Sequence, residues 1–227
     1  MAPVSGFRVV FLACLAIAAL AAPTPARVLA PGSLKARWPI KTTVPSNAQL
    51  GHAHEVQISD LLGLQDVPGV ASQDAQYRNL RIPTPVNGLH EGDIIRTRGW
   101  VHLIAMDDDG DYHIQMSDSP TTAARCLIVE LPMDQAKFEK DPALRARSAT
   151  ERKMLRAKLL HDATQEPLKG GNLMQHPPYM VVAGQLFFDD WHVGGGKRGL
   201  SKKNHPMKAS TLWEIHPVTD IGFAPVP

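Results

Sequence analysis

Two histidines that lie far apart in the sequence, His113 and His216, have the chemistry of metal ligands. His113 follows an Asp-Gly turn and His216 lies in the last apolar run, so a closed sheet would allow the two rings to face one another. Neutral imidazoles together with a carboxylate suit zinc or another divalent ion. The sequence therefore predicts a metal site at His113 and His216, with Asp189 as ligand or base and with His102, Asp190 and His192 near enough to join it.

The same two histidines also have a simpler interpretation. Buried histidines commonly hydrogen-bond a backbone carbonyl or a carboxylate, and Glu214 lies two residues before His216. No H-x-H or H-x-x-x-H spacing joins two of the expected ligands. The predicted metal site therefore depends on the predicted topology.

A second set of residues has the chemistry of anion binding. Side chains alternate along a strand, so four basic or aromatic residues share one face of the strand expected from Ile94. The segment 194–210 is basic and contains no acidic residue. A basic and aromatic groove holds single-stranded nucleic acid or another anionic polymer, whereas a solvated loop is the alternative. The predicted ligand-binding residues are Arg96, Arg98, Trp100, His102, Lys197, Arg198, Lys202 and Lys203.

Two further patterns do not fit the sites that they suggest. The run from Asp107 to Asp111 is rich in carboxylates, but a calcium loop that began at Asp107 would have Tyr112 in place of its glycine and Asp118 in place of its glutamate. A hairpin turn explains these residues better. The run GGGKRG at 194–199 matches G-x-G-x-x-G, but a strand rather than a helix follows it, which indicates a flexible loop.

The elements that would position these residues begin with Gly92 to Pro132, which reads as three antiparallel strands. A helix is expected from about Thr150 to His161, with a capping box at Ser148 and Glu151. Two more strands follow, in the runs YMVVAGQLFFDDW and TLWEIHPVTDI.

This order predicts a mainly β fold, a five-stranded OB-like barrel with a helix between strands 3 and 4. We expect the last strand to close against the first. The mid-strand glycines Gly99 and Gly184 suit a tightly curved sheet. An open α+β sheet with one helix packed on it is the alternative.

Four stretches carry a resemblance to a known group: DGDYHIQMSD, CLIVELP, VVAGQLFFDDWH and WEIHPVTDI. They resemble uncharacterised exported bacterial proteins with an OB-like barrel, in which a DYH turn is combined with a C-terminal E-x-HPV strand. The resemblance covers about residues 92–221 and implies a fold and an exported location rather than an activity. The positions that it emphasises are Asp111, Tyr112, His113, Glu214, His216 and Pro217.

The first residues predict export. Arg8 precedes an uncharged apolar run, and the small residues Ala19 and Ala21 suit a cleavage site, so residues 1–22 read as a signal peptide. We expect a lead-in with little regular structure over 23–90 and a barrel domain over 91–222. The mature, periplasmic or secreted chain would have no transmembrane segment and would retain Cys126 as its single cysteine.

These observations support three functions. The first is an exported, non-catalytic binding module for an anionic ligand such as single-stranded nucleic acid. The alternative is a metal-dependent hydrolase centred on His113 and His216. A structural component of the envelope is the third. The formal net charge of +2 does not favour binding of polyanions by the whole surface.

Overall fold

The computed structural model describes residues 37–42, 51–135, 141–195, 199–202 and 205–227. The predicted signal peptide lies outside the described residues, as do Lys197, Arg198 and Lys203. Among the residues that the structure describes, no helix combines the length and the apolar character that crossing a bilayer requires.

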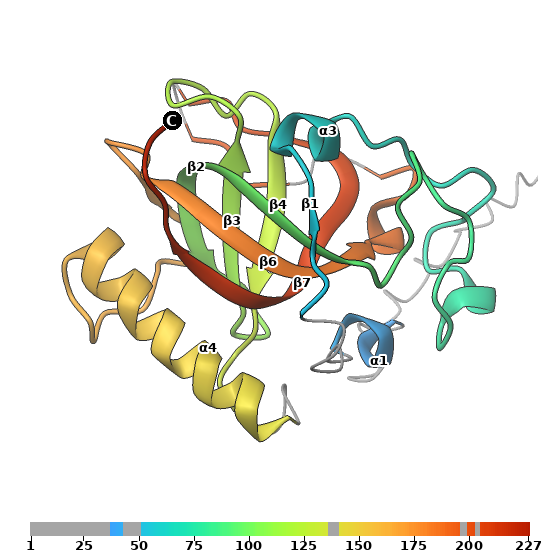
Figure 1. The fold of residues 1–227 in the computed structure, drawn as a ribbon, viewed down its shortest axis with the longest axis horizontal. Coiled ribbons are helices and arrows are strands. Elements are labelled where there is room, and N and C mark those ends of the chain that lie inside the picture. Colours follow the sequence, from blue (N-terminus) through green and yellow to red (C-terminus); the bar gives the residue numbers. More distant parts are fainter. Residues whose placement is uncertain (1–36, 43–50, 136–140, 196–198, 203–204) are drawn as a thin grey trace, which may run out of the picture. The chain divides into compact units, whose positions relative to one another are not determined.

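The described chain is mainly β and contains a closed, five-stranded mixed barrel of the OB-like type, as predicted (Figure 1). The fourth barrel strand pairs with the first and thereby closes the ring, and helix α4 comes between the third and fourth barrel strands. The third and fifth barrel strands are parallel, whereas the other neighbours are antiparallel. The barrel strands in chain order are β2 (Ile94–Met106), β3 (Tyr112–Ser117), β4 (Cys126–Leu131), β6 (Tyr179–Phe188) and β7 (Ala209–Phe223).

The closing pair of strands differs from the prediction. Strand β7, which was expected to close against the first strand, lies between β4 and β6 instead. Strand β6 closes the barrel on β2, in a register that runs from Ile94 opposite Gln185 to Trp100 opposite Tyr179. A strand has two hydrogen-bonding edges, and both edges of β7 are already paired, so β7 cannot also pair with β2.

Two glycines permit the sharp curvature of the barrel. A Cβ atom on Gly99 would lie 2.5 Å from Ile58 Cδ1 and 2.8 Å from the Ser117 carbonyl oxygen. A Cβ atom on Gly184 would lie 2.5 Å from the Pro217 carbonyl oxygen, at a point where the register between β6 and β7 shifts. Any larger residue would push the neighbouring strand away, so the predicted role of these glycines is consistent with the packing.

Helix α4 (Pro142–Leu155) begins earlier than predicted. The Asp141 side chain accepts hydrogen bonds from the backbone N–H groups of Ala143 and Leu144, and Pro142 occupies the first turn, where its missing N–H costs nothing. Ser148, the predicted cap, is a buried residue inside the helix. The helix packs against β7 and passes into a π-helical turn (Arg156–Leu160) that ends at His161.

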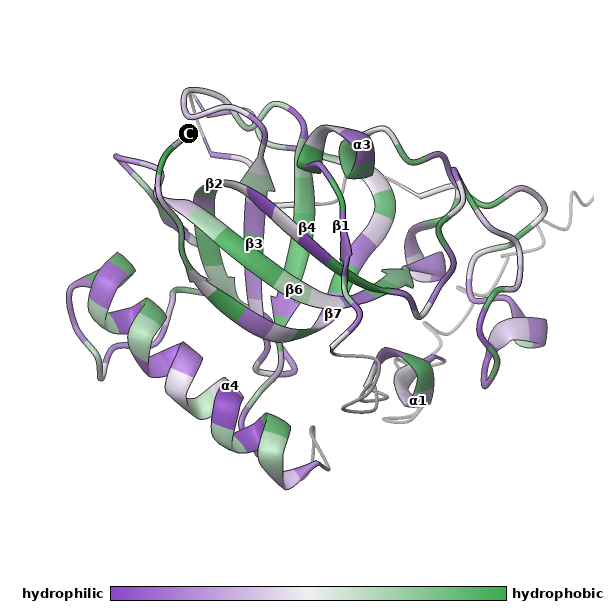
Figure 2. Cartoon of the chain, viewed as in Figure 1, coloured by the Kyte–Doolittle hydropathy of each residue, from purple (hydrophilic) through white to green (hydrophobic). Residues whose placement is uncertain are grey.

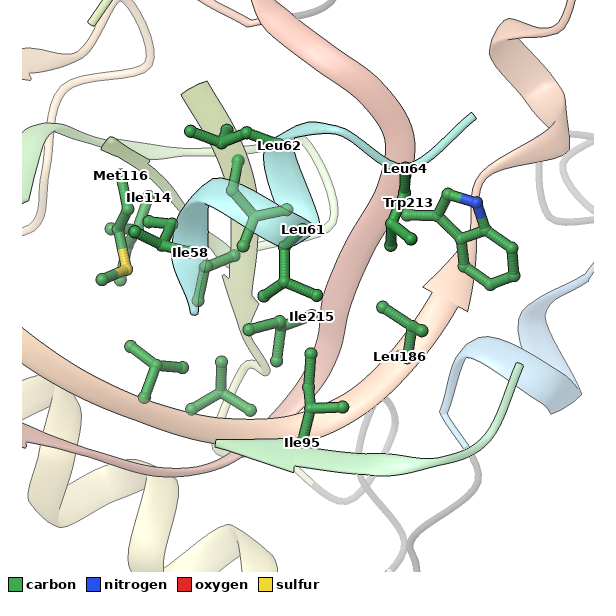
Figure 3. Packing of buried hydrophobic residues seen from close by; sticks show 14 of the residues in the cluster. Ile58, Leu61, Leu62, Leu64, Ile95, Ile114, Met116, Leu186, Trp213 and Ile215 are labelled. Carbon is green, nitrogen blue, oxygen red and sulfur yellow. The ribbon is translucent and has the colours of Figure 1, made fainter. Parts of the chain in front are cut away.

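The barrel interior holds the main apolar core, and residues that precede the barrel strands in the sequence contribute to it. Figure 3 shows helix α3 (Ile58–Leu62) presenting Ile58 and Leu61 to core residues such as Ile95 and Ile114. In Figure 2, β4 is mostly hydrophobic, whereas β3 carries more hydrophilic residues. The remaining short elements are α1 (Trp38–Lys41), β1 (His54–Glu55), η2 (Ala75–Tyr77), β5 (Asn172–Leu173) and η4 (Asp190–His192).

Candidate metal centre

A cluster of ionisable side chains lies on the outer face of three neighbouring barrel strands. In β3 the residues on either side of His113 belong to the apolar core, so His113 faces away from it. Glu130 lies opposite His113 on β4, and the adjoining Val129 pairs with Ile215 of β7. His216 follows Ile215 and therefore has the same outward orientation. Strand pairing thus places His113, Glu130 and His216 side by side.

His216 is completely buried, and its two ring nitrogens differ in their hydrogen bonding. Its Nδ1 lies 2.7 Å from Glu130 Oε2, which is a strong hydrogen bond. Its Nε2 lies 3.6 Å from Asp111 Oδ2 and has no hydrogen-bond partner among the described residues. Asp111 is itself fixed, because its Oδ1 accepts a hydrogen bond from the Met133 backbone N–H at 2.8 Å.

His113 has two carboxylates near one ring nitrogen and a glutamine near the other. Its Nδ1 lies 3.5 Å from Glu130 Oε1 and 3.6 Å from Asp107 Oδ2. Its Nε2 lies 3.3 Å from Gln115 Oε1, an oxygen that also accepts a hydrogen bond from the Leu200 backbone N–H. Because Gln115 offers an acceptor there, His113 Nε2 is the donor. This contact fixes the orientation of the ring.

Lys41 covers the cluster from helix α1. Its Nζ lies 2.7 Å from Glu130 Oε2 and 3.8 Å from Glu214 Oε1. Arg37 secures the start of the helix, because its guanidinium bonds Glu91 at 2.6 Å and the Phe188 carbonyl oxygen at 2.7 Å. With the helix held in this way, the Lys41 ammonium group is a counter-ion for the buried carboxylates of Glu130 and Glu214.

The two buried carboxylates that flank His216 have opposite pKa shifts. Burial, followed by the charge of Asp109, raises the pKa of Asp111 to about 8. Burial also acts to raise the pKa of Glu130, but Lys41 and the two histidines outweigh it and hold this pKa well below its usual range. Glu130 is therefore the permanently charged centre of the cluster, and Asp111 is its titrating neighbour near neutral pH.

The two histidines also differ in pKa. Burial acts to lower the pKa of His113, but the carboxylates of Asp107 and Glu130 prevail and raise it to about 10. Burial and the charge of Lys41 lower the pKa of His216, so its ring is neutral at pH 7. A neutral imidazole is the form that binds a metal ion, so His216 is already in that form, whereas an ion bound at His113 would displace its proton.

The donor atoms form two overlapping groups that are suited to a metal ion. One group is Asp111, Glu130 and His216, and the other is Asp107, His113 and Glu130; in each group the ligand atoms lie within 4.8 Å of one another. Ligands at about 2.0 to 2.2 Å around a tetrahedral ion are about 3.3 to 3.6 Å apart. The separations of 3.5 and 3.6 Å between the histidine nitrogens and the carboxylates fall in that range.

Comparison with known proteins adds no family. No protein-family model matches the chain, and no curated protein matches it either.

The structure brings His113 and His216 together around Glu130, whereas the other residues expected near them belong to neither group of ligand atoms. Asp189 accepts a hydrogen bond from the Trp191 N–H and lies 3.5 Å from His192. Asp190 accepts a hydrogen bond from the backbone of Asp74 instead.

Sequence reasoning missed the contributions of Glu130 and Lys41. Glu130 is the single charged residue of the apolar run CLIVELP, and a charge within a strand that is otherwise buried was the available signal. Lys41 lies in a stretch without regular periodicity, so no local pattern pointed to it. Asp111 was interpreted as part of a hairpin turn.

The predicted anion-binding face is partly neutralised. Arg98 and Arg96 lie 2.9 Å and 3.8 Å from the carboxylate of Glu55, and the Trp100 ring packs at 5.0 Å from Tyr179. Lys202 donates a hydrogen bond to the Gly170 carbonyl oxygen. The guanidinium groups therefore have a partner within the chain already.

His102, the fourth residue of that face, is buried and lines a cavity. Its Nε2 lies 2.9 Å from Ser117 Oγ and 2.8 Å from the Ser119 carbonyl oxygen. The cavity has a volume of about 180 Å³ and is lined by His102, Leu173 and the segments 121–123 and 205–207. It therefore adjoins the described end of the basic segment.

Proposed function

We propose that the protein is an exported, metal-dependent hydrolase that binds a divalent ion of the zinc class beside His216 and Asp111 and acts on an anionic substrate. The observation that carries the proposal is the position of His216 Nε2, fully buried, without a hydrogen-bond partner among the described residues and 3.6 Å from a buried carboxylate oxygen. A buried polar atom without a partner is costly. A metal ion between the two atoms would remove that cost.

The contacts around His216 fit a metal ligand in a second respect. Metal-binding histidines usually donate the other ring N–H to a carboxylate, which fixes the tautomer and increases the basicity of the ligand nitrogen. Glu130 accepts such a bond from His216 Nδ1 at 2.7 Å. The lone pair of Nε2 is then directed toward Asp111.

An ionic network that serves only to stabilise the fold explains the cluster less well. Buried ion pairs contribute little to stability, because desolvation offsets their attraction. Here two histidines, a lysine and at least three carboxylates share one buried site. Ionisable groups that are concentrated and strongly shifted in this way are typical of functional sites.

The edge of the cluster near Asp107 is open to solvent, and the nearby basic segment 194–210 could attract an anionic substrate. The Asp107 side chain is 43% exposed, so solvent reaches this side of the site. Gln115 contacts His113 and also bonds the backbone of Leu200, which joins the cluster to the basic segment 194–210. A phosphate ester that is attracted by the segment would lie beside the ion, which activates water for hydrolysis.

Metal binding by the purified protein tests the proposal. We expect the unmutated chain to bind Zn²⁺ in isothermal titration calorimetry and His216→Ala and Asp111→Asn to reduce that binding at least tenfold. His90→Ala is the matched control, because His90 is exposed and lies 3.7 Å from Asp93, yet belongs to neither group. Metal-dependent cleavage of bis(p-nitrophenyl) phosphate is the expected activity. An unmutated protein that binds no metal would overturn the proposal.

A second candidate function is the non-catalytic binding module for an anionic polymer. The cavity beside His102, next to the basic segment, favours it. Binding of a single-stranded oligonucleotide would then weaken steeply with salt and decrease when Lys202 and Lys208 are both changed to glutamate. Binding that is independent of salt, or that survives this double substitution, would exclude the module.

A further inference from the structure

The two oxygens of Glu130 have different neighbours. Oε2 contacts His216 Nδ1 and Lys41 Nζ, both at 2.7 Å, whereas Oε1 lies 3.5 Å from His113 Nδ1. Asp107 Oδ2 approaches the same histidine nitrogen at 3.6 Å. We infer that Asp107, His113 and Glu130 form a second metal site, so that the centre holds two divalent ions with Glu130 between them. This inference rests on the proposed function.

The distances at His113 suit ligation better than hydrogen bonding. Hydrogen bonds from N–H to oxygen are mostly about 2.7 to 3.2 Å long. Both carboxylate contacts of His113 Nδ1, at 3.5 and 3.6 Å, are longer than that and longer than the 3.3 Å hydrogen bond from Nε2 to Gln115. Ligands of one tetrahedral ion at about 2.1 Å are separated by about 3.4 Å. One ion at the centre of Asp107, His113 and Glu130 would satisfy both contacts.

Gln115 orients His113 for this role. The amide of Gln115 is completely buried, and its oxygen is fixed by the backbone N–H of Leu200. Since His113 Nε2 donates to that oxygen, Nδ1 is the atom directed toward Asp107 and Glu130. A hydrogen bond on the far nitrogen is the usual device that holds a metal-binding imidazole in place.

The two sites differ in access to solvent. The Asp111 side chain is 2% exposed and that of His216 is 0% exposed, whereas the Asp107 side chain is 43% exposed. The first ion would be the more enclosed and the more firmly held of the two. The second would exchange readily and retain positions for water and substrate, as catalytic ions do.

The charges of the cluster accommodate two ions. Four carboxylates, those of Asp107, Asp111, Glu130 and Glu214, lie within 4 Å of His113, His216 or Lys41. Together they can offset the charge of two divalent ions. The Lys41 ammonium competes for Glu130, but its side chain is 21% exposed and lies at the end of a short helix, so it can turn outward.

The exposed ion suits the hydrolysis of a phosphate ester, because a bound metal ion lowers the pKa of the water that it holds. Water bound at the exposed ion attacks phosphorus, so that a new P–O bond forms and the bond to the leaving oxygen breaks. The leaving oxygen departs as an alcohol after it takes up the proton that the water releases.

The number of ions bound per chain tests the second site. We expect calorimetry with Zn²⁺ to give two equivalents for the unmutated chain, the second binding more weakly, and one equivalent for Asp107→Asn and for His113→Ala. Asp108→Asn is the matched control, because Asp108 lies in the same turn and its side chain is 94% exposed. Since Asp107 is on the surface, its variant should fold, as circular dichroism will verify.

Cobalt gives an independent measurement. With Co²⁺ in place of zinc, the visible absorption of the unmutated chain should change on addition of the first and of the second equivalent, whereas that of Asp107→Asn should change on addition of the first alone. One equivalent in the unmutated chain, unchanged by Asp107→Asn, would overturn the two-ion centre and leave the proposed function intact. No bound metal at all would overturn both.

Discussion

Lys41 is the single residue whose role depends most on whether metal is present. Its ammonium contacts the Glu130 oxygen that also bonds His216. Burial acts to lower the pKa of Lys41, but the charges of Glu130 and Glu214 outweigh burial and raise this pKa. Without metal it neutralises buried carboxylates; with metal it repels the ion. We expect Lys41→Met to increase Zn²⁺ affinity about tenfold, or ~1.4 kcal/mol, measured by calorimetry.

The same substitution should have the opposite effect on the metal-free chain. Removing the ammonium leaves buried carboxylates uncompensated, so the melting temperature should fall without zinc and rise more on its addition. Lys153→Met, at an exposed position of α4, is the control. Affinity that is unchanged in Lys41→Met would mean that the ammonium does not compete with the ion.

Glu151 makes stability depend on pH. Burial between α4 and β7 raises its pKa from 4.5 to about 7, although Oε1 accepts a hydrogen bond from the Ile221 N–H. Between these two values the unfolded chain loses the proton while the folded chain retains it, so the fold becomes progressively less stable as pH rises from about 4.5 to about 7. We expect Glu151→Gln to match the unmutated melting temperature at pH 4 and to exceed it at pH 8.

A glutamine can keep the hydrogen bond to Ile221 but cannot ionise, which makes it the appropriate substitution. Glu166→Gln serves as a comparison, because Glu166 is 44% exposed and pairs with Arg156. A stability difference between Glu151→Gln and the unmutated chain that stays constant from pH 4 to pH 8 would show that Glu151 does not titrate in this range.

The residues that could be predicted from the sequence are those whose type is informative by itself. Histidine is a metal ligand in many settings, so the sequence indicates His113 and His216 without any knowledge of their neighbours. A lone glutamate in an apolar strand, such as Glu130, has no local partner. Lys41 reaches Glu130 across 89 positions of sequence, a separation at which only the folded chain brings residues together.

At the level of elements, helix α4 fixes the turn that carries Asp111. Arg152 is buried beneath the helix, donates to the Gly110 carbonyl oxygen at 3.0 Å and lies 3.6 Å above the Tyr112 ring. Its loss removes a buried charged hydrogen bond and a cation–π contact. We expect Arg152→Ala to lower the free energy of unfolding by about 2 to 4 kcal/mol, measured by urea denaturation, and to weaken zinc binding.

Lys153→Ala separates this effect from helix propensity, because it also replaces a long basic side chain by alanine, at the adjacent, exposed position. It should alter stability by less than about 0.5 kcal/mol. If Arg152→Ala lost stability but bound zinc as before, the helix would support the barrel without positioning Asp111.

The strand pattern was predictable because alternation and turns are local. The first three barrel strands, the order of the elements and the mid-strand glycines can all be predicted from residues that are neighbours in the sequence. The pairing of β7 did not, since a parallel contact with β4 joins strands separated by the whole of α4 and β6. Helix α4 was placed too late because Ser148 resembles a cap in sequence, whereas Asp141 followed by proline is the cap that forms.

For the whole molecule, the segment 51–90 completes the barrel core. Prolines and glycines punctuate it, so the sequence indicates connection, yet several of its apolar side chains join the main core cluster. Leu61 and Leu64 lie beside barrel residues such as Leu186 and Trp213 (Figure 3). Periodicity did not reveal this, because a chain that fills the end of a barrel needs apolar residues at irregular intervals.

Leu61 is the most direct test of that contribution. It is 0% exposed, and truncation would leave a cavity between α3 and the barrel. We expect Leu61→Ala to lower the free energy of unfolding by about 3 kcal/mol in a single cooperative transition. Leu80→Ala, at a leucine that is 62% exposed, should change it by less than about 0.5 kcal/mol. Were the two variants equally stable, or were Leu61→Ala to unfold in two steps, the segment would be an appendage to the barrel. A single transition with the larger loss means that 51–90 and the strands bearing the metal centre fold as one unit.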